Sequence, residues 1–170
     1  MATAALIPVE EYLRSSWEPD REYVDGVVLE RNLGELPHSY LQGLFLRLFT
    51  ARGLHAFVEL RTQVKPRRFR IPDVLAMREA PKSRFIRTPP FIVVEILSPE
   101  DRISALVDKI DDYLDFGVPN IWVVDPARQT ISSWTRDGSH VFTGAVETSD
   151  GSVSIAFEEI FSGMPEVDSE

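Results

Sequence analysis

Cysteine is absent from all 170 residues of this chain. Its absence excludes disulfides, thiolate nucleophiles and zinc sites built on cysteine. The three histidines, His38, His55 and His140, lack metal-ligand spacing. Gly43 and Gly53 stand alone, and neither a glycine-rich phosphate loop nor a Gly-x-Ser-x-Gly elbow is present. Zinc chemistry, phosphate-loop nucleotide binding and serine-hydrolase chemistry are therefore disfavoured.

Long hydrophobic runs are also lacking. The longest, such as residues 91–97, are far too short to cross a bilayer. The first eight residues carry no basic stretch before their short apolar segment, so we expect no signal peptide. These features predict a cytoplasmic protein that does not bind membranes.

Positive charge is in deficit, with 18 Lys and Arg against 27 Asp and Glu and a net charge of −9. This balance disfavours a protein that coats nucleic acid non-specifically. Basic residues nevertheless gather in two segments, comprising Lys65, Arg67, Arg68 and Arg70, then Lys82, Arg84 and Arg87. The segments are interpreted either as backbone contacts to nucleic acid or as solvated loops.

The length and an ordinary composition predict a single domain over residues 1–170, with an acidic tail at 163–170 that is frayed. Apolar periodicity and turn residues predict the following elements: a helix at 6–14, a hairpin at 22–30 turning at Asp25-Gly26, a helix at 38–52, strands at 56–64, 70–77, 91–97 and 120–126, a helix at 103–116 ended by Gly117, a hairpin at 130–143, a small strand near 153 and a short helix at 157–161.

After the first hairpin the order is helix, strand, strand, strand, helix, strand. This order predicts an α/β fold with a mixed sheet flanked by helices, in which the last helix makes a crossover connection. We expect an edge at strands such as 120–124 or the later hairpin, which leaves open a symmetric homodimer.

Two carboxylates interrupt strongly apolar strands, Asp73 within 70–77 and Glu95 within 91–97. A buried ionised carboxylate is costly unless it is paired, hydrogen-bonded or bound to metal. Two of them on strands expected to be neighbours favour a divalent-cation site. The alternative is that Asp73 is a turn or cap residue and Glu95 an edge-strand carboxylate facing solvent.

An ordered set of motifs accompanies these carboxylates: Glu22-Tyr-Val-Asp-Gly26, His38, Ile71-Pro-Asp73, Glu95, Ser98-Pro99, Lys109, Tyr113, Gly117-Val118 and Ile121-Trp-Val-Val-Asp-Pro126. With this set the chain resembles the Uma2 family (DUF820), a bacterial group in the PD-(D/E)XK nuclease superfamily. The resemblance covers about residues 20–126, which it implies to be a restriction-endonuclease-like core of α-β-β-β-α-β order.

The resemblance further implies that Asp73 and Glu95 bind Mg²⁺ or Mn²⁺, with the backbone carbonyl of Ile96 as a third ligand. Two carboxylates and a carbonyl suit Mg²⁺, which keeps several waters. One departure matters, because the signature lysine two residues after Glu95 is here Leu97. Lys109 is the expected substitute, with Tyr113 one turn later. Alternatively, Lys109 is a surface residue paired with Asp112.

Two further residues have supporting roles in this hypothesis. His38 would take the place of an acidic residue that touches the metal in related nucleases, although a histidine beside a helix start can equally be structural. Glu22 is a weaker candidate, since most hairpin glutamates are exposed.

The resulting hypothesis is a Mg²⁺- or Mn²⁺-dependent endonuclease acting on nucleic acid, with DNA as the expected substrate. Lys65, Arg67, Arg68, Arg70, Arg84 and Arg87 would contact the backbone. The alternative is a catalytically lapsed nuclease-like fold that serves as a binding or assembly module, which Leu97 and the net charge of −9 favour.

Overall fold

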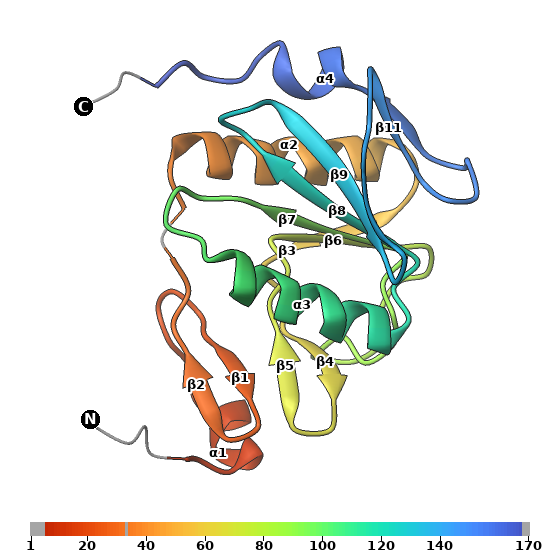
Figure 1. The fold of residues 1–170 in the computed structure, drawn as a ribbon. Helices are drawn as coiled ribbons and strands as arrows, with labels where there is room; N and C mark the ends of the chain where they lie inside the picture. Colours follow the sequence, from red (N-terminus) through yellow and green to blue (C-terminus); the bar gives the residue numbers. More distant parts are fainter. Residues whose placement is uncertain (1–5, 33, 168–170) are drawn as a thin grey trace.

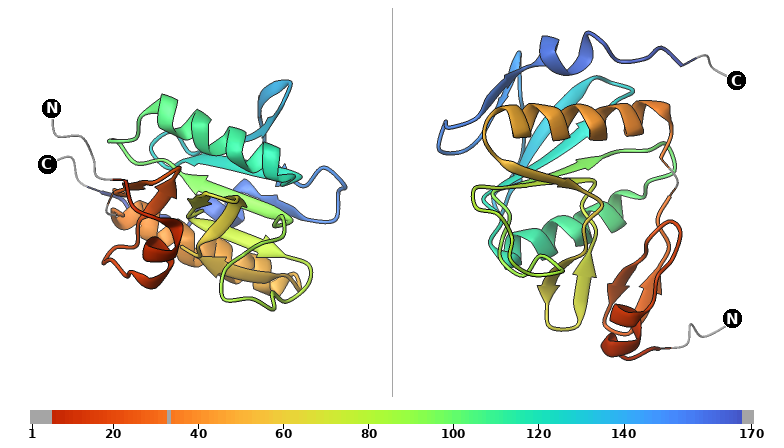
Figure 2. Two further views of the ribbon diagram at one scale, coloured as in Figure 1. Left: turned by 90° about the horizontal axis from the view of Figure 1, so that it is seen from below. Right: turned by 180° about the vertical axis from the view of Figure 1, so that it is seen from behind.

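The computed structural model describes residues 6–32 and 34–167. A six-stranded sheet lies between two long helices, α2 on one face and α3 on the other (Figures 1 and 2). The four helices of the described residues are α1 (Val9–Arg14), α2 (Leu36–Ala51), α3 (Ile103–Phe116) and α4 (Phe157–Phe161). The predicted α/β class is confirmed.

The six-stranded sheet has the order β10-β9-β8-β7-β6-β3. Its strands are β3 (His55–Val58), β6 (Val74–Met77), β7 (Ile92–Ile96), β8 (Asn120–Asp125), β9 (Thr130–Thr135) and β10 (Gly138–Val141). The β7–β8 pair is parallel, and all other neighbouring strand pairs of this sheet are antiparallel. This makes the sheet mixed, with α3 as the crossover helix, as predicted.

A second sheet stands below the first in Figure 1 and has the order β2-β1-β5-β4. Its strands are β1 (Glu22–Val24), β2 (Val27–Leu29), β4 (Thr62–Lys65) and β5 (Arg68–Arg70). A small sheet of β11 (Ala145–Glu147) and β12 (Ser154–Ala156) completes the strands. Along the chain, the main sheet and its two long helices follow the predicted core order α2, β3, β6, β7, α3, β8. The hairpin of β4 and β5 is inserted between β3 and β6.

The core is split between the two faces of the main sheet. Side chains of β6 and β7 alternate between the faces. Val74 and Val94 pack with Phe45 of α2, whereas Leu75 and Val93 pack on the α3 side. This alternation determines which polar side chain of each strand points towards α3.

Both ends of α3 agree with the prediction because its signals are local. Ile110 and Tyr113 are buried on one stripe. Gly117 follows with φ +98°, a left-handed conformation that a residue with a Cβ adopts only at a cost. Helix α2 starts at Leu36, two residues earlier than predicted, because Pro37 fits the first turn of a helix.

The prediction of one strand over 56–64 is wrong. Strand β3 ends at Val58, and Glu59 has φ +52°. The chain then enters the second sheet as β4. Arg61 between the two strands is buried and pairs with Asp20. The stretch 70–77 is likewise divided between β5 and β6, with Asp73 directly before β6.

The expected edge at 120–124 is also wrong, because β8 lies inside the sheet between β7 and β9. The edges are β10, on the predicted later hairpin, and β3. The tail predicted to be frayed is described only to Val167, and residues 168–170 lie outside the described part, as do residues 1–5 and Leu33.

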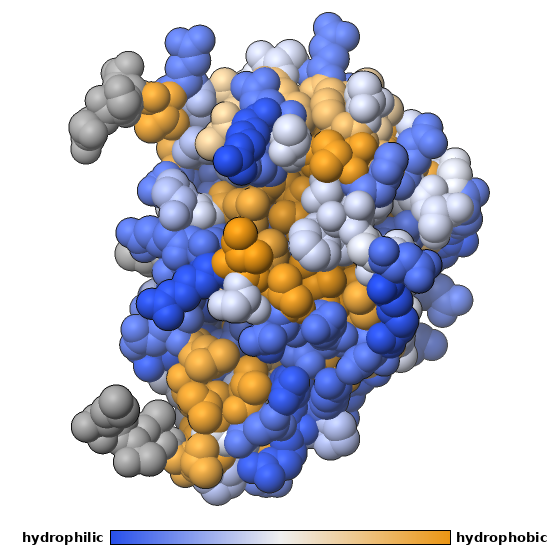
Figure 3. Space-filling model, in the orientation of Figure 1, coloured by the Kyte–Doolittle hydropathy of each residue, from blue (hydrophilic) through white to orange (hydrophobic). Residues whose placement is uncertain are grey.

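On the face drawn in Figure 3, apolar side chains gather in a central patch and in a second patch near the N-terminal hairpin, with a hydrophilic band between them. Ile103 is 76% exposed at the start of α3, and Leu6 is 69% exposed beside the hairpin. In the described residues, no helix is both long enough and apolar enough to cross a membrane.

Candidate active site

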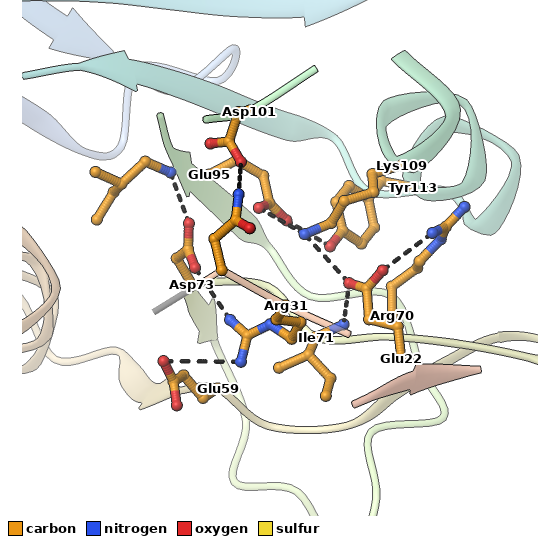
Figure 4. A network of polar contacts seen from close by, with 12 residues as sticks. Glu22, Arg31, Glu59, Arg70, Ile71, Asp73, Glu95, Asp101, Lys109 and Tyr113 are labelled. Atoms are coloured by element: carbon orange, nitrogen blue, oxygen red, sulfur yellow. Dashed lines mark hydrogen bonds and ion pairs between the residues drawn. The ribbon is translucent and has the colours of Figure 1, made fainter. Parts of the chain in front are cut away.

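Asp73 and Glu95 lie side by side at one end of the main sheet. Val74 is opposite Val94 in the antiparallel β6–β7 pair, which places Asp73 next to Glu95. Residues opposite each other in such a pair point to the same face. Both side chains are buried, and both line one cavity of about 320 Å³ (Figure 4). Opposed orientations, which would exclude a shared ion, are therefore not found.

Asp73 is held as a carboxylate by its neighbours. The backbone N–H of Ile96 donates to Asp73 Oδ2 at 2.8 Å, His38 Nε2 lies 3.2 Å from the same oxygen, and Arg31 Nη2 lies 3.2 Å from Oδ1. Burial alone would favour the neutral acid, yet the hydrogen bond from His38 and the charge of Lys109 bring the pKa of Asp73 below its ordinary value.

His38 stands in the first turn of α2, facing Asp73. Burial opposes its charged form, but the hydrogen bond and charge of Asp73 outweigh burial and raise the pKa of His38. Its other ring nitrogen, Nδ1, is buried and has no hydrogen-bond partner among the described residues. The geometry places His38 against a carboxylate as a donor.

The pKa of Glu95 is shifted in the opposite direction from that of Asp73. Tyr113 donates to Glu95 Oε1 at 2.6 Å and Lys109 Nζ donates to Oε2 at 2.8 Å. Burial is the largest influence and raises the pKa of Glu95 to about 7, because the charge of Lys109 only partly opposes it and the charge of Asp73 adds to it. The two carboxylates repel each other across the cavity.

Lys109 points from α3 into this site and not along the helix surface. Its Nζ also lies 3.2 Å from Glu22 Oε1, so the ammonium bridges two buried carboxylates. Burial opposes the charge of Lys109, but Glu22 and Glu95 outweigh it and raise its pKa. The alternative partner considered from sequence, Asp112, makes ion pairs with other residues.

Glu22 is buried, unlike a typical hairpin glutamate. It accepts a hydrogen bond from the N–H of Ile71 at 3.0 Å and pairs with Arg70 Nη1 at 3.0 Å. Arg70 Nε in turn donates to Asp112 Oδ2 at 2.7 Å. These contacts run from Asp112 of α3 through Arg70 of β5 to Glu22 of β1 and back to Lys109. The second sheet therefore supplies one wall of the site, and Figure 4 shows the part from Arg70 through Glu22 to Lys109.

The six basic residues predicted to contact nucleic acid fall into two groups. Lys65, Arg68 and Arg70 form ion pairs with Asp112 on α3, and Arg70 is buried. The exposed members are Arg67, Arg84 and Arg87. The charge of the first group is largely compensated inside the molecule, whereas the second group remains available at the surface.

Two residues of the site, Arg31 and Asp112, were not predicted from the sequence. Arg31 follows the hairpin and no pattern marks it, yet it contacts Asp73. Asp112 was considered only as a partner of Lys109, although an aspartate one residue before Tyr113 on a buried helix face was a usable signal.

The oxygen donors present suit a divalent cation. Within the described residues, no group of three or more His, Asp or Glu side chains is arranged to hold a metal ion. Two carboxylates with a backbone carbonyl nevertheless suffice for an ion that retains water. Ile96 lines the same cavity as Asp73 and Glu95. Burial and the charge of Asp73 raise the pKa of Glu95, and a bound cation would oppose both by favouring the ionised carboxylate.

Comparisons with known proteins identify the family and the fold of this chain. The family model Uma2, described as "Putative restriction endonuclease", matches residues 9–164. A crystal structure described as that of "a putative nuclease belonging to DUF820" from Anabaena variabilis superposes with a TM-score of 0.80. The two chains are 22% identical, and the match covers 92% of this chain and 98% of the other. No curated protein matches. The restriction-endonuclease-like fold predicted from the motifs is confirmed.

Proposed function

Because the chain belongs to the Uma2 family, we propose that it is a metal-dependent nuclease that hydrolyses phosphodiester bonds in nucleic acid, with DNA as the expected substrate. One observation carries the proposal: the buried side chains of Asp73 and Glu95 line one cavity together with the ammonium of Lys109. Asp73, Glu95 and the carbonyl of Ile96 would hold Mg²⁺ or Mn²⁺. When bound, such an ion polarises a phosphodiester and activates water.

The protein's own residues have separable tasks in this proposal. Tyr113 and Lys109 each donate to one oxygen of Glu95 and thereby orient its carboxylate. Lys109 keeps its proton because two carboxylates flank it. Its positive charge beside the cavity would stabilise negative charge that develops on the phosphate. His38 and the N–H of Ile96 orient Asp73.

Leu97 raised the alternative of a lapsed enzyme, since a leucine cannot stabilise charge. Lys109 supplies an ammonium 2.8 Å from Glu95 from the neighbouring helix, and this contact favours catalysis over the lapsed fold. Glu22 of the second sheet contacts the same ammonium. We therefore propose that both sheets act as one domain.

Arg67, Arg84 and Arg87 are the proposed contacts to the nucleic-acid backbone, because they are exposed and Lys65, Arg68 and Arg70 are paired internally. A homodimer through the edge strand β10 and a cytoplasmic location remain predictions.

The first test is calorimetric titration of Mn²⁺ into the wild type and into the double variant Asp73→Ala/Glu95→Ala. We expect saturable binding to the wild type that the double variant loses. Cleavage of plasmid DNA in Mn²⁺ follows, with Lys109→Met expected to cut at least a hundredfold more slowly, the usual scale for a charge-stabilising group. Exposed Asp108→Asn on the same helix serves as the matched control. Absence of Mn²⁺ binding to the wild type, alone and with oligonucleotide, would favour the lapsed fold.

A further inference from the structure

Arg31 is a cation inside the candidate site for which no pattern in the sequence predicted a role. It follows β2 and reaches into the cavity, with a side chain only 12% exposed. Its guanidinium lies 3.2 Å from Asp73 Oδ1 and 3.7 Å from Glu59 Oε1 (Figure 4). Only the first contact is within hydrogen-bond distance.

The contacts of Asp73 differ between its two oxygens. Oδ2 faces two donors, His38 Nε2 and the N–H of Ile96, which use its two lone pairs. Oδ1 faces Arg31. Oδ1 is therefore the oxygen of Asp73 that retains a lone pair for a cation, and Arg31 lies against this oxygen.

Arg31 is also held by fewer short contacts than Lys109 and Arg70, the other two ion-paired lysine or arginine side chains of this cavity. Lys109 and Arg70 each contact two carboxylates at 3.2 Å or less. Arg31 has a single carboxylate contact of that length. A divalent ion at Asp73 would repel the nearby guanidinium, and the weakest contact would yield first.

We propose that Arg31 is an internal counter-ion that competes with the divalent cation for Asp73 and, once displaced, binds a phosphate of the nucleic-acid substrate. A guanidinium is suited to this exchange because its planar fork matches a carboxylate and a phosphate alike. The second half of the proposal rests on the proposed nuclease function. It makes binding of metal and of phosphate mutually favourable, since each removes a competitor of the other.

The competition is tested by titrating Mn²⁺ calorimetrically into the wild type, Arg31→Met and Arg31→Lys, without nucleic acid. Arg31→Met should bind Mn²⁺ about tenfold more tightly, because a charge-assisted hydrogen bond no longer has to be broken. Arg31→Lys retains a competing charge and should stay near the wild type. Arg102→Met is the matched control, since Arg102 lines the same cavity and is exposed. If Arg31→Met does not fold, Arg31→Gln replaces it with the same expectation.

The coupling is tested by repeating the titrations with a phosphorothioate-linked oligodeoxynucleotide, after subtracting Mn²⁺ binding by the oligonucleotide alone. The oligonucleotide should tighten Mn²⁺ binding in the wild type several-fold and leave Arg31→Met unchanged. Equal Mn²⁺ affinity of the wild type and Arg31→Met, with binding still abolished in Asp73→Ala/Glu95→Ala, would overturn the role of Arg31 while the metal site stands. Absence of Mn²⁺ binding to every variant would overturn the proposed function, and this inference with it.

Discussion

Glu95 lies in an apolar strand, where burial and the charge of Asp73 raise its pKa and the charge of Lys109 lowers it. Its pKa of about 7 means that the folded, metal-free protein retains a proton which the unfolded chain releases near the ordinary value of 4.5. The folded state therefore binds more protons across this interval, and stability falls as pH rises through it. The pKa values of Asp73 and Glu22 are lowered, so their stabilisation is complete above their ordinary values and is lost only in acid.

We predict that the free energy of unfolding of the metal-free protein falls by about 2 kcal/mol between pH 5 and pH 7, on the scale set by the shift of Glu95. Glu95→Gln keeps the shape of the side chain but cannot titrate, so its stability should depend much less on pH. Urea denaturation at several pH values measures both.

The raised pKa of His38 contributes in the same direction, since its stabilisation is full below its ordinary value of 6.5 and is lost as pH rises through the folded-state pKa. The stability of Glu95→Gln should therefore keep a residual dependence on pH. The double variant Glu95→Gln/His38→Gln should lose that residual dependence. Exposed Glu158→Gln is the control. A slope in Glu95→Gln equal to that of the wild type would contradict the assignment.

At the scale of elements, α3 joins the two sheets. Its inner face packs Ile110 and Tyr113 into the core and carries Lys109 to the site. Asp112 on the same helix is 1% exposed and faces cations of β4 and β5. The position of Glu22 relative to Lys109 therefore depends on how α3 holds the second sheet.

Asp112→Asn should destabilise the protein by about 3 kcal/mol, because removing one partner of a buried ion pair leaves the other charge uncompensated. The expected loss is at the lower end of the usual range, since Arg70 retains Glu22 and Arg68 retains Asp25. Urea denaturation provides the measurement. The neighbouring Asp111 is exposed, so that Asp111→Asn should change stability little. Equal effects of the two substitutions would argue against the network.

For the whole molecule, the question is how a chain of net charge −9 would bind a polyanion. Asp112 already compensates much of the basic 65–70 segment. Binding would then depend on a few exposed arginines and on the site itself, which predicts weak association with a modest salt dependence, because the slope scales with the number of phosphates neutralised.

The triple variant Arg67→Gln/Arg84→Gln/Arg87→Gln should lower the slope of log affinity against log salt by about 2 to 3 on duplex DNA, close to one for each phosphate that is no longer neutralised. Fluorescence anisotropy with a labelled duplex in Ca²⁺ measures this slope. Arg47→Gln/Arg128→Gln/Arg136→Gln removes equal charge from exposed positions elsewhere and should leave the slope nearly unchanged. Similar slopes for the two variants would place the phosphate-binding residues elsewhere on the surface.

Much of the fold follows from local signals, and these were legible in the sequence. The apolar period and Gly117 defined α3 at both ends, and Asp25-Gly26 defined the turn between β1 and β2. The two carboxylates stood out because they interrupt apolar strands. The antiparallel pairing of β6 and β7 then brought them together.

What the tertiary structure alone decided is where the chain changes sheets and which charges meet. Glu59 and Arg61 interrupt the predicted strand 56–64 where the chain leaves one sheet for the other. The pairs Arg31–Asp73 and Arg70–Asp112 are each separated by 42 residues. The physical reason is that periodicity and turn chemistry act within a few neighbouring residues, whereas an ion pair depends on which elements pack together. The sequence by itself therefore determined the elements and the two carboxylates, and packing decided the cations around them.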